Sequence, residues 1–272
     1  MPSTEAIAAI IREIAQTEIV PRFRMLARDE IREKGPGDFV TTADLEAERQ
    51  LTRRLVDALP GSAVLGEEAA AEDRTLFDLL TGDVPVWVID PVDGTGNFAR
   101  GQPGFAVIVA RVQHAEVRAG WIYDPLADVT VTAEAGAGAW SKGVRLEVTR
   151  NVAGKDMIGA AYGRTAAGSR AGKALAESGR IGAVRNLGCS GLEYVELALG
   201  RAQFSLHSRS LPWDHAAGML ITREAGGIAG FLDGAPYDPR IATRPVLAAA
   251  DQAAWDIVRD IAGSWPLSRS RK

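Results

Sequence analysis

The sequence contains a single cysteine, Cys189, among 272 residues. One cysteine excludes an intramolecular disulfide framework and is compatible with a reducing cytoplasm, where we expect the protein to reside. No apolar run approaches the roughly 20 residues of a membrane-spanning helix. The N-terminus also lacks a basic region followed by a hydrophobic stretch. We therefore expect no membrane partner.

An excess of positive charge is also missing. The chain carries 31 basic and 35 acidic residues, and its net charge of −4 provides no general attraction to nucleic acid or to an anionic membrane. The histidines number only three, and none belongs to a Ser-His-Asp or Cys-His pattern. The sequence therefore predicts neither nucleic-acid binding nor catalysis through a side-chain nucleophile.

What the sequence does contain is enough apolar material for a large core, since 46% of its residues are hydrophobic and 24% are charged. The length exceeds the usual size of one domain, and the pattern of elements changes near residue 150 without a Ser/Gly/Pro-rich spacer. We predict two tightly packed halves, an α+β half at 1–150 and an α/β half at 151–272.

The first half is predicted to begin with two helices. Apolar residues recur at helical spacing over 7–14, and Pro21 is expected to kink or split that helix. Thr41 and Asp44 resemble a capping box that opens the second helix. A short strand is then predicted at 63–65 and a longer one at 84–89. Four β-rich runs, which predict an antiparallel meander, follow at 105–112, 117–123, 129–134 and 139–148.

Strands and helices alternate in the second half, which is typical of an α/β layer. The predicted strands lie at 157–161, 183–186, 202–207, 228–231 and 246–249. The predicted helices lie near 169–177, at 191–199, from 214 onward and at 251–261.

The segment richest in chemistry follows the predicted strand at 84–89. This strand delivers Asp90 to its C-terminal end, and Pro91 stiffens the exit so that Asp93 turns back toward Asp90. Two carboxylates held this close repel each other unless a cation lies between them, and Mg²⁺ binds carboxylate oxygens, water and substrate phosphate. Gly94 and Thr95 add unhindered N–H groups and a hydroxyl that suit a phosphate.

Three other interpretations fit this segment less well. A solvated turn is the simplest, because Asp, Pro and Gly are turn formers, but a turn does not require two acids at the end of a buried strand. Phosphatases with an aspartyl nucleophile carry Asp-x-Asp, whereas the spacing here is Asp-x-x-Asp. A helix-loop-helix calcium site needs alternating oxygen ligands and a distant Glu, which this loop lacks.

Three separated motifs carry a family resemblance. They read GEE at 66–68, DPVDGT at 90–95 and WDHAAG at 213–218. In this order and at these intervals the chain resembles, over nearly its whole length, the inositol monophosphatase family of Mg²⁺-dependent, lithium-sensitive phosphatases. The resemblance implies a layered αβαβα sandwich of α+β and α/β type, the fold shared with fructose bisphosphatase.

The resemblance also implies roles for individual residues around two or three Mg²⁺ ions. The implied metal ligands are Glu67, Asp90, the backbone carbonyl of Val92, Asp93 and Asp214. The implied catalytic residues, which orient and activate water for direct in-line attack, are Glu67, Thr95 and Asp44. The implied substrate-binding residues are Asp93, Gly94, Thr95, His207 and Asp214. Without the resemblance, Asp44 is only a first-turn acid and Asp214 only a capping residue.

One position departs from the family pattern. Inositol phosphate hydrolases usually carry an acid seven residues before the aspartate of the Trp-Asp pair, and this acid accepts hydrogen bonds from ring hydroxyls. Here the position is His207, which accepts at most one. Arg209 follows and faces the same side if the chain is still extended, and a basic patch there would suit a second phosphate or a carboxylate.

The expected substrate is therefore a small phosphorylated metabolite. We expect inositol 1-phosphate to be hydrolysed without being the best substrate. The alternatives are nucleotide or sugar bisphosphates and histidinol phosphate, and an alternative of another class is a catalytically idle scaffold protein. Because family members are commonly dimers, a homodimer is expected, and the meander is a candidate face.

Overall fold

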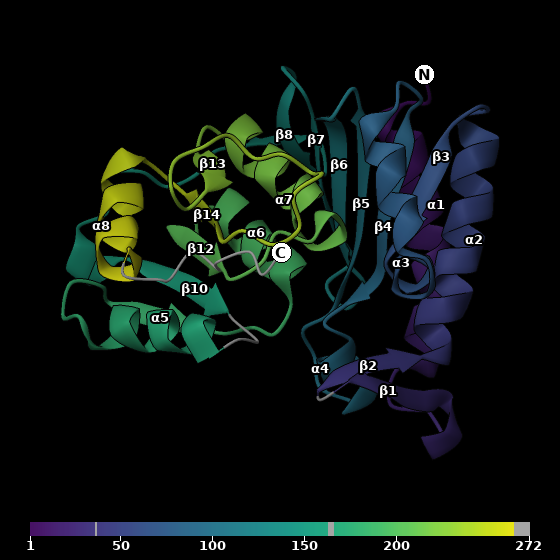
Figure 1. Cartoon of the computed structure of the whole chain (residues 1–272), viewed down its shortest axis with the longest axis horizontal. Helices are drawn as coiled ribbons and strands as arrows, with labels where there is room; N and C mark the ends of the chain where they lie inside the picture. Colours follow the sequence, from purple (N-terminus) through teal and green to yellow (C-terminus); the bar gives the residue numbers. More distant parts are fainter. Residues whose placement is uncertain (36, 163–165, 264–272) are drawn as a thin grey trace.

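The structure is a computed structural model that describes residues 1–35, 37–162 and 166–263. It stacks five layers, seen edge-on in Figure 1. The helices α1 (Thr4–Ile14) and α2 (Thr42–Ala58) cover the outer face of a large sheet. Its inner face packs on α6 (Ser190–Ala198) and α7 (Pro212–Glu224), which separate it from a smaller sheet. Behind the smaller sheet lie α5 (Ala166–Glu177) and α8 (Gln252–Ala262). This arrangement confirms the predicted αβαβα sandwich.

The large sheet contains seven strands in the order β3-β4-β5-β6-β7-β8-β9. Their bounds are β3 (Ala63–Gly66), β4 (Val86–Asp93), β5 (Ala106–Gln113), β6 (Glu116–Asp124), β7 (Val129–Glu134), β8 (Gly138–Ser141) and β9 (Val144–Leu146). Neighbours from β4 to β9 pair antiparallel, so the meander is confirmed. The run predicted at 139–148 is two strands, because Lys142 and Gly143 both adopt positive φ and form a tight turn between them.

Strand β4 differs from its prediction at both ends. Val84 is 47% exposed and precedes the strand, which begins at Val86 and continues through Asp93 with every residue buried. The pairing with β5 shifts register between Asp90 and Asp93. Pro91 lies in this interval, where the ladder does not need the N–H that proline lacks. The two acids therefore belong to a buried strand rather than to a loop.

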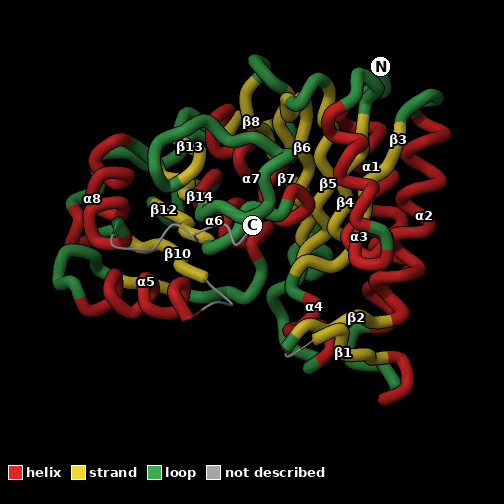
Figure 2. Tube along the Cα trace, viewed as in Figure 1, coloured by secondary structure: helices red, strands yellow, loops and turns green. Residues whose placement is uncertain are grey.

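The smaller sheet is mixed, with five strands in the order β11-β10-β12-β14-β13. The bounds are β10 (Ile158–Tyr162), β11 (Ala183–Arg185), β12 (Phe204–His207), β13 (Ile228–Phe231) and β14 (Val246–Ala249). The strand β10 pairs parallel with β11 and β12, whereas β14 runs antiparallel to both of its neighbours. Figure 2 shows these strands between α5 and α8 on one side and α6 and α7 on the other.

The N-terminal helix changes geometry before Pro21, as predicted. A π-helical turn at Ala15–Ile19 and a 3₁₀ turn at Val20–Arg22 follow α1, because proline cannot supply an N–H to a regular helix. Four short elements near the site were not predicted. They are the antiparallel hairpin β1 (Ile31–Gly35) and β2 (Asp38–Thr41), and the helices α3 (Glu67–Glu72) and α4 (Thr95–Ala99).

The proposed boundary near residue 150 falls between β9 in the large sheet and β10 in the smaller one. One hydrophobic cluster joins Leu65 and Ile108 of the large sheet to Leu220 of α7 and Val246 of the smaller sheet. The division into halves stays a prediction, and residues 264–272 lie outside the described part of the chain. Among the described residues, no helix has both the length and the apolar character needed to span a bilayer.

Candidate active site

The first two acids of the site meet because their strands are neighbours. The strands β3 and β4 run parallel and pair Gly66 with Ile89, so Glu67 and Asp90 follow at the same edge of the sheet. Asp90 Oδ1 also accepts a hydrogen bond of 3.0 Å from the backbone N–H of Val92. The two carboxylates are therefore held by backbone geometry rather than by flexible loops.

The third acid comes from α7. Asp214 lies in the first turn of this helix, where the helix dipole favours a negative charge. Gly120 of β6 lets this helix approach the large sheet closely. A Cβ at that position would lie 2.8 Å from Cα of Ala217. Carboxylate oxygens of Glu67, Asp90 and Asp214 all lie within 4.8 Å of one another. The large sheet and the central helix layer thus meet at one cluster of oxygen ligands.

Asp93 connects the large sheet to the start of α6. Its Oδ2 accepts hydrogen bonds from the backbone N–H of Gly191 at 2.6 Å, from Cys189 Sγ at 3.0 Å and from Ser190 Oγ at 3.2 Å. These donors favour the ionised carboxylate and fix its orientation. One oxygen of Asp93 is therefore committed to α6.

The turn after Asp93 requires glycine. Gly94 has a φ of 89°, and a Cβ there would lie 2.6 Å from the carbonyl oxygen of Gly104. The chain then enters the short helix α4 at Thr95. This turn brings the Thr95 hydroxyl back beside the end of β4.

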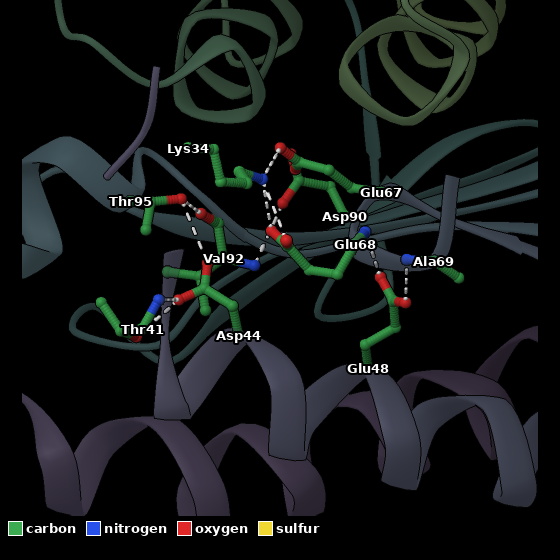
Figure 3. Close-up of polar contacts among 10 residues, drawn as sticks. All are labelled: Lys34, Thr41, Asp44, Glu48, Glu67, Glu68, Ala69, Asp90, Val92 and Thr95. Atoms are coloured by element: carbon green, nitrogen blue, oxygen red, sulfur yellow. Dashed lines mark hydrogen bonds and ion pairs between the residues drawn. The ribbon is translucent and has the colours of Figure 1, made fainter. Parts of the chain in front are cut away.

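The Thr95 hydroxyl lies between two acceptors, shown in Figure 3. Its oxygen is 2.9 Å from the carbonyl oxygen of Val92 and 3.1 Å from Asp44 Oδ1. Asp44 Oδ2 accepts from the N–H of Thr41 at 2.9 Å and from its hydroxyl at 2.5 Å, so the predicted capping box is confirmed. Burial raises the pKa of Asp44 to about 7. This carboxyl can therefore exchange a proton near neutral pH.

The clustered acids create a strong negative field. Burial raises the pKa of Asp90 well above its usual range, and the charges of Glu67, Asp93 and Asp214 raise it further. Burial likewise raises the pKa of Glu67 and of Asp93. Such a cluster is stable as charged groups only with a cation close by.

A lysine that the sequence analysis did not consider faces this cluster. Lys34 of the β1–β2 hairpin points its Nζ at Glu68, 2.8 Å from Oε1, and lies 3.4 Å from Glu67 Oε1 (Figure 3). Glu68 is therefore a neighbouring acid paired with lysine. Glu48 of α2 was also missed, and its carboxylate accepts the N–H groups of Glu68 and Ala69, both at 2.9 Å, at the start of α3.

A cavity of about 600 Å³ opens over these groups. The predicted site residues that line it are Glu67, Asp90, Asp93, Gly94, Thr95, His207 and Asp214. Asp44 and Val92 contact Thr95 from behind this wall. The structure therefore brings the predicted residues together, while their binding and catalytic roles stay predictions.

The sequence predicts a basic patch formed by His207 and Arg209, but only Arg209 carries a positive charge. His207 is only 3% exposed, and burial lowers its pKa to about 3, so its imidazole is neutral at physiological pH. Its Nε2 lies 2.7 Å from Ser205 Oγ. Arg209 is exposed and lines the cavity, as do Arg74 and Arg100. Three exposed arginines therefore contribute positive charge to the cavity lining.

Comparisons with known proteins agree with this geometry. The family described as "Inositol monophosphatase family" matches residues 3–263. An inositol-1-monophosphatase of Mesorhizobium japonicum is 36% identical over 74% of this chain and 75% of its own. A fructose-1,6-bisphosphatase/inositol-1-monophosphatase of Thermotoga maritima is 33% identical over 72% of this chain and 73% of its own. The structure of a Thermotoga maritima IMPase superposes with a TM-score of 0.80 at 26% identity, covering 95% of each chain.

Proposed function

This chain belongs to the inositol monophosphatase family, and from that membership we propose that it is a phosphoric monoester hydrolase that uses Mg²⁺ to hydrolyse small phosphorylated metabolites. The observation that carries the proposal is the convergence of Glu67, Asp90 and Asp214 beside the Thr95 hydroxyl. Three acids from three elements would repel one another without a bound cation, so the cluster favours a metal-binding site.

The residues present suit magnesium. The donor atoms at this site are hard oxygens from carboxylates, and the cavity leaves room for water and substrate. The residues proposed to hold two or three ions are Glu67, Asp90, the carbonyl of Val92, Asp93 and Asp214. Bound Mg²⁺ supplies an activated water and neutralises charge on the phosphate and on the leaving oxygen.

The chain's own residues then orient the reaction. Asp44 accepts a hydrogen bond from Thr95 and is the carboxyl group placed to take up a proton through that hydroxyl as water is activated. Glu67 together with Thr95 orients that water. In this proposal the backbone N–H groups of Gly94 and Thr95, at the start of α4, stabilise the negative charge that phosphate oxygens gain in the transition state.

The neutral His207 and the surrounding arginines favour a second acceptor or anion on the substrate. A ring polyol prefers a carboxylate at this position, whereas a bisphosphate is attracted to Arg209 and its neighbours. We therefore propose that inositol 1-phosphate is hydrolysed with lower kcat/KM than a sugar or nucleotide bisphosphate. Histidinol phosphate is the weaker alternative, since its ammonium group prefers acids.

A phosphate-release assay tests the proposal. Fructose 1,6-bisphosphate, adenosine 3′,5′-bisphosphate, inositol 1-phosphate and histidinol phosphate are compared with and without Mg²⁺. We expect Mg²⁺-dependent turnover with a bisphosphate ranked first. Absence of metal-dependent turnover on every compound favours the scaffold role, whereas a preference for inositol 1-phosphate contradicts only the substrate ranking. His207→Glu is expected to shift selectivity toward inositol 1-phosphate.

A further inference from the structure

A buried carboxyl group shares the cavity wall with His207. Glu193 lies on α6. Glu193 is 2% exposed and His207 is 3% exposed. Both residues nevertheless contribute to the lining of the cavity. Neither the metal cluster nor the proposed steps at Thr95 uses Glu193.

Strand geometry connects Glu193 to His207 through a serine. Successive residues of β12 face opposite sides, so Ser205 and His207 point the same way, while Phe204 and Leu206 pack into the core of the smaller sheet. Ser205 Oγ lies 2.7 Å from His207 Nε2 and 3.2 Å from Glu193 Oε2. Glu193 Oε2 and His207 Nε2 are themselves 3.4 Å apart. We call the connected groups of Glu193, Ser205 and His207 the relay.

The ring of His207 is held by its neighbours. The Tyr194 ring stacks on it with centroids 5.7 Å apart, and the His215 ring lies 4.6 Å away on α7. The Tyr194 hydroxyl is 3.0 Å from His215 Nδ1, which fixes both neighbours. With Nε2 committed to Ser205, Nδ1 of His207 makes no hydrogen bond to the residues that the structure describes.

The single hydroxyl proton of Ser205 allows two arrangements. If Glu193 carries a proton, it donates to Ser205, Ser205 donates to His207 Nε2, and the imidazole proton resides on Nδ1. If Glu193 is ionised, Ser205 donates to the carboxylate and His207 must donate through Nε2. The state of Glu193 therefore decides which ring nitrogen bears the proton.

We propose that Glu193 acts through Ser205 to hold His207 as the Nδ1–H tautomer, so that the cavity wall offers a hydrogen-bond donor to the end of the substrate remote from the hydrolysed phosphate. Burial raises the pKa of Glu193 to about 8 and lowers that of His207 to about 3, so both groups are neutral at pH 7. Leu187 N–H donates to the other oxygen of Glu193 at 3.2 Å and fixes its orientation.

The relay selects a substrate class, and in this respect it rests on the proposed phosphatase function. An Nδ1–H donor beside Arg209 stabilises an acceptor, most strongly a second phosphate or a carboxylate. Glu193 and Ser205 are positioning residues in this scheme, because the ring of His207 is the group that meets the ligand.

The tautomer is measured directly by ¹⁵N NMR of the imidazole nitrogens in the protein without substrate. The chain has only three histidines, so comparison with His207→Gln identifies the signals. We expect a protonated Nδ1 in the wild type and in Glu193→Gln, whose amide donates to Ser205 as the carboxylic acid does. Ser205→Ala is expected to give a mixture of tautomers. A wild-type His207 protonated on Nε2 overturns the proposal.

Kinetics give the second readout. The kcat/KM ratio of fructose 1,6-bisphosphate to phenyl phosphate, which has no second polar group, is expected to fall about tenfold in Ser205→Ala. The ratio stays within about twofold in Glu193→Gln. A matched control is Ser141→Ala, which removes a buried hydroxyl whose one hydrogen-bond partner in the described part of the chain is the Thr130 carbonyl. An unchanged kcat/KM ratio in Ser205→Ala refutes the relay. Turnover of phenyl phosphate in the same experiment supports the proposed phosphatase function. A wild type inactive on both compounds refutes the phosphatase, and the NMR result still decides the tautomer.

Discussion

Asp44→Asn separates the stability of the site from its chemistry. The asparagine oxygen can accept both hydrogen bonds from Thr41, and its amide can donate to the Thr95 oxygen, so that the single Thr95 hydroxyl proton is donated to the Val92 carbonyl. The substitution therefore preserves the number of hydrogen bonds and removes one buried charge. We expect a more stable metal-free protein that has lost most of its activity.

The magnitude follows from the pKa of Asp44, which burial raises from the ordinary 3.8 to about 7. Below pH 3.8 the carboxyl is protonated in both the folded and the unfolded chain. As the pH rises to 7, the unfolded chain releases this proton while the native protein retains it, so the wild type loses stability by about 1.4 kcal/mol per pH unit. Above pH 7 the loss is constant at about 4 kcal/mol.

The assay is urea unfolding in EDTA at two pH values. The gain of the variant over the wild type is expected to be about 1–2 kcal/mol at pH 5 and about 4 kcal/mol at pH 8. In Mg²⁺ its kcat is expected to fall by about 100-fold or more, because Thr95 loses the acceptor that takes a proton. A variant that is destabilised at both pH values, or stabilised equally at both, shows that burial of the charge is not what governs Asp44.

Three further predictions concern packing, inhibition and assembly. Gly218→Ala is expected to lower stability by about 1–3 kcal/mol in urea unfolding, because its Cβ would lie 2.1 Å from Tyr194, whereas Gly35→Ala meets no atom within 4 Å and serves as the control. Lithium is expected to inhibit through the second metal position, and an activity titration that stays flat contradicts this family trait. Light scattering is expected to give the mass of a homodimer, and a monomer at all concentrations contradicts that expectation.

The convergence of Glu67 and Asp90 was predictable because both follow apolar runs, and the ends of adjacent parallel strands share one edge. The place of Asp214 was different. Its position at a helix start follows from the pattern, but nothing local indicates that α7 lies against the large sheet. Only the resemblance of three separated motifs supplied that contact.

Lys34 and Glu193 show what local patterns miss. Lys34 lies in the strand β1, where three of the five residues are exposed, so no apolar alternation marks the strand. Glu193 reads as an ordinary helical acid, and it is buried because α6 packs between the two sheets and beside α7. Tertiary context decides the environment of both side chains, and propensity carries no information about it.

The hydrogen bond from Gly191 to Asp93 also bears on the order of events during synthesis. Its partners are 98 residues apart in the chain, whereas the strands of the meander pair with their sequence neighbours. Contacts between near neighbours form early, and distant ones wait until loop closure is possible. A nascent chain that has not yet passed residue 214 holds only part of the acid cluster. The acid cluster is therefore complete only after α6 and α7 have been synthesised and have packed against the large sheet.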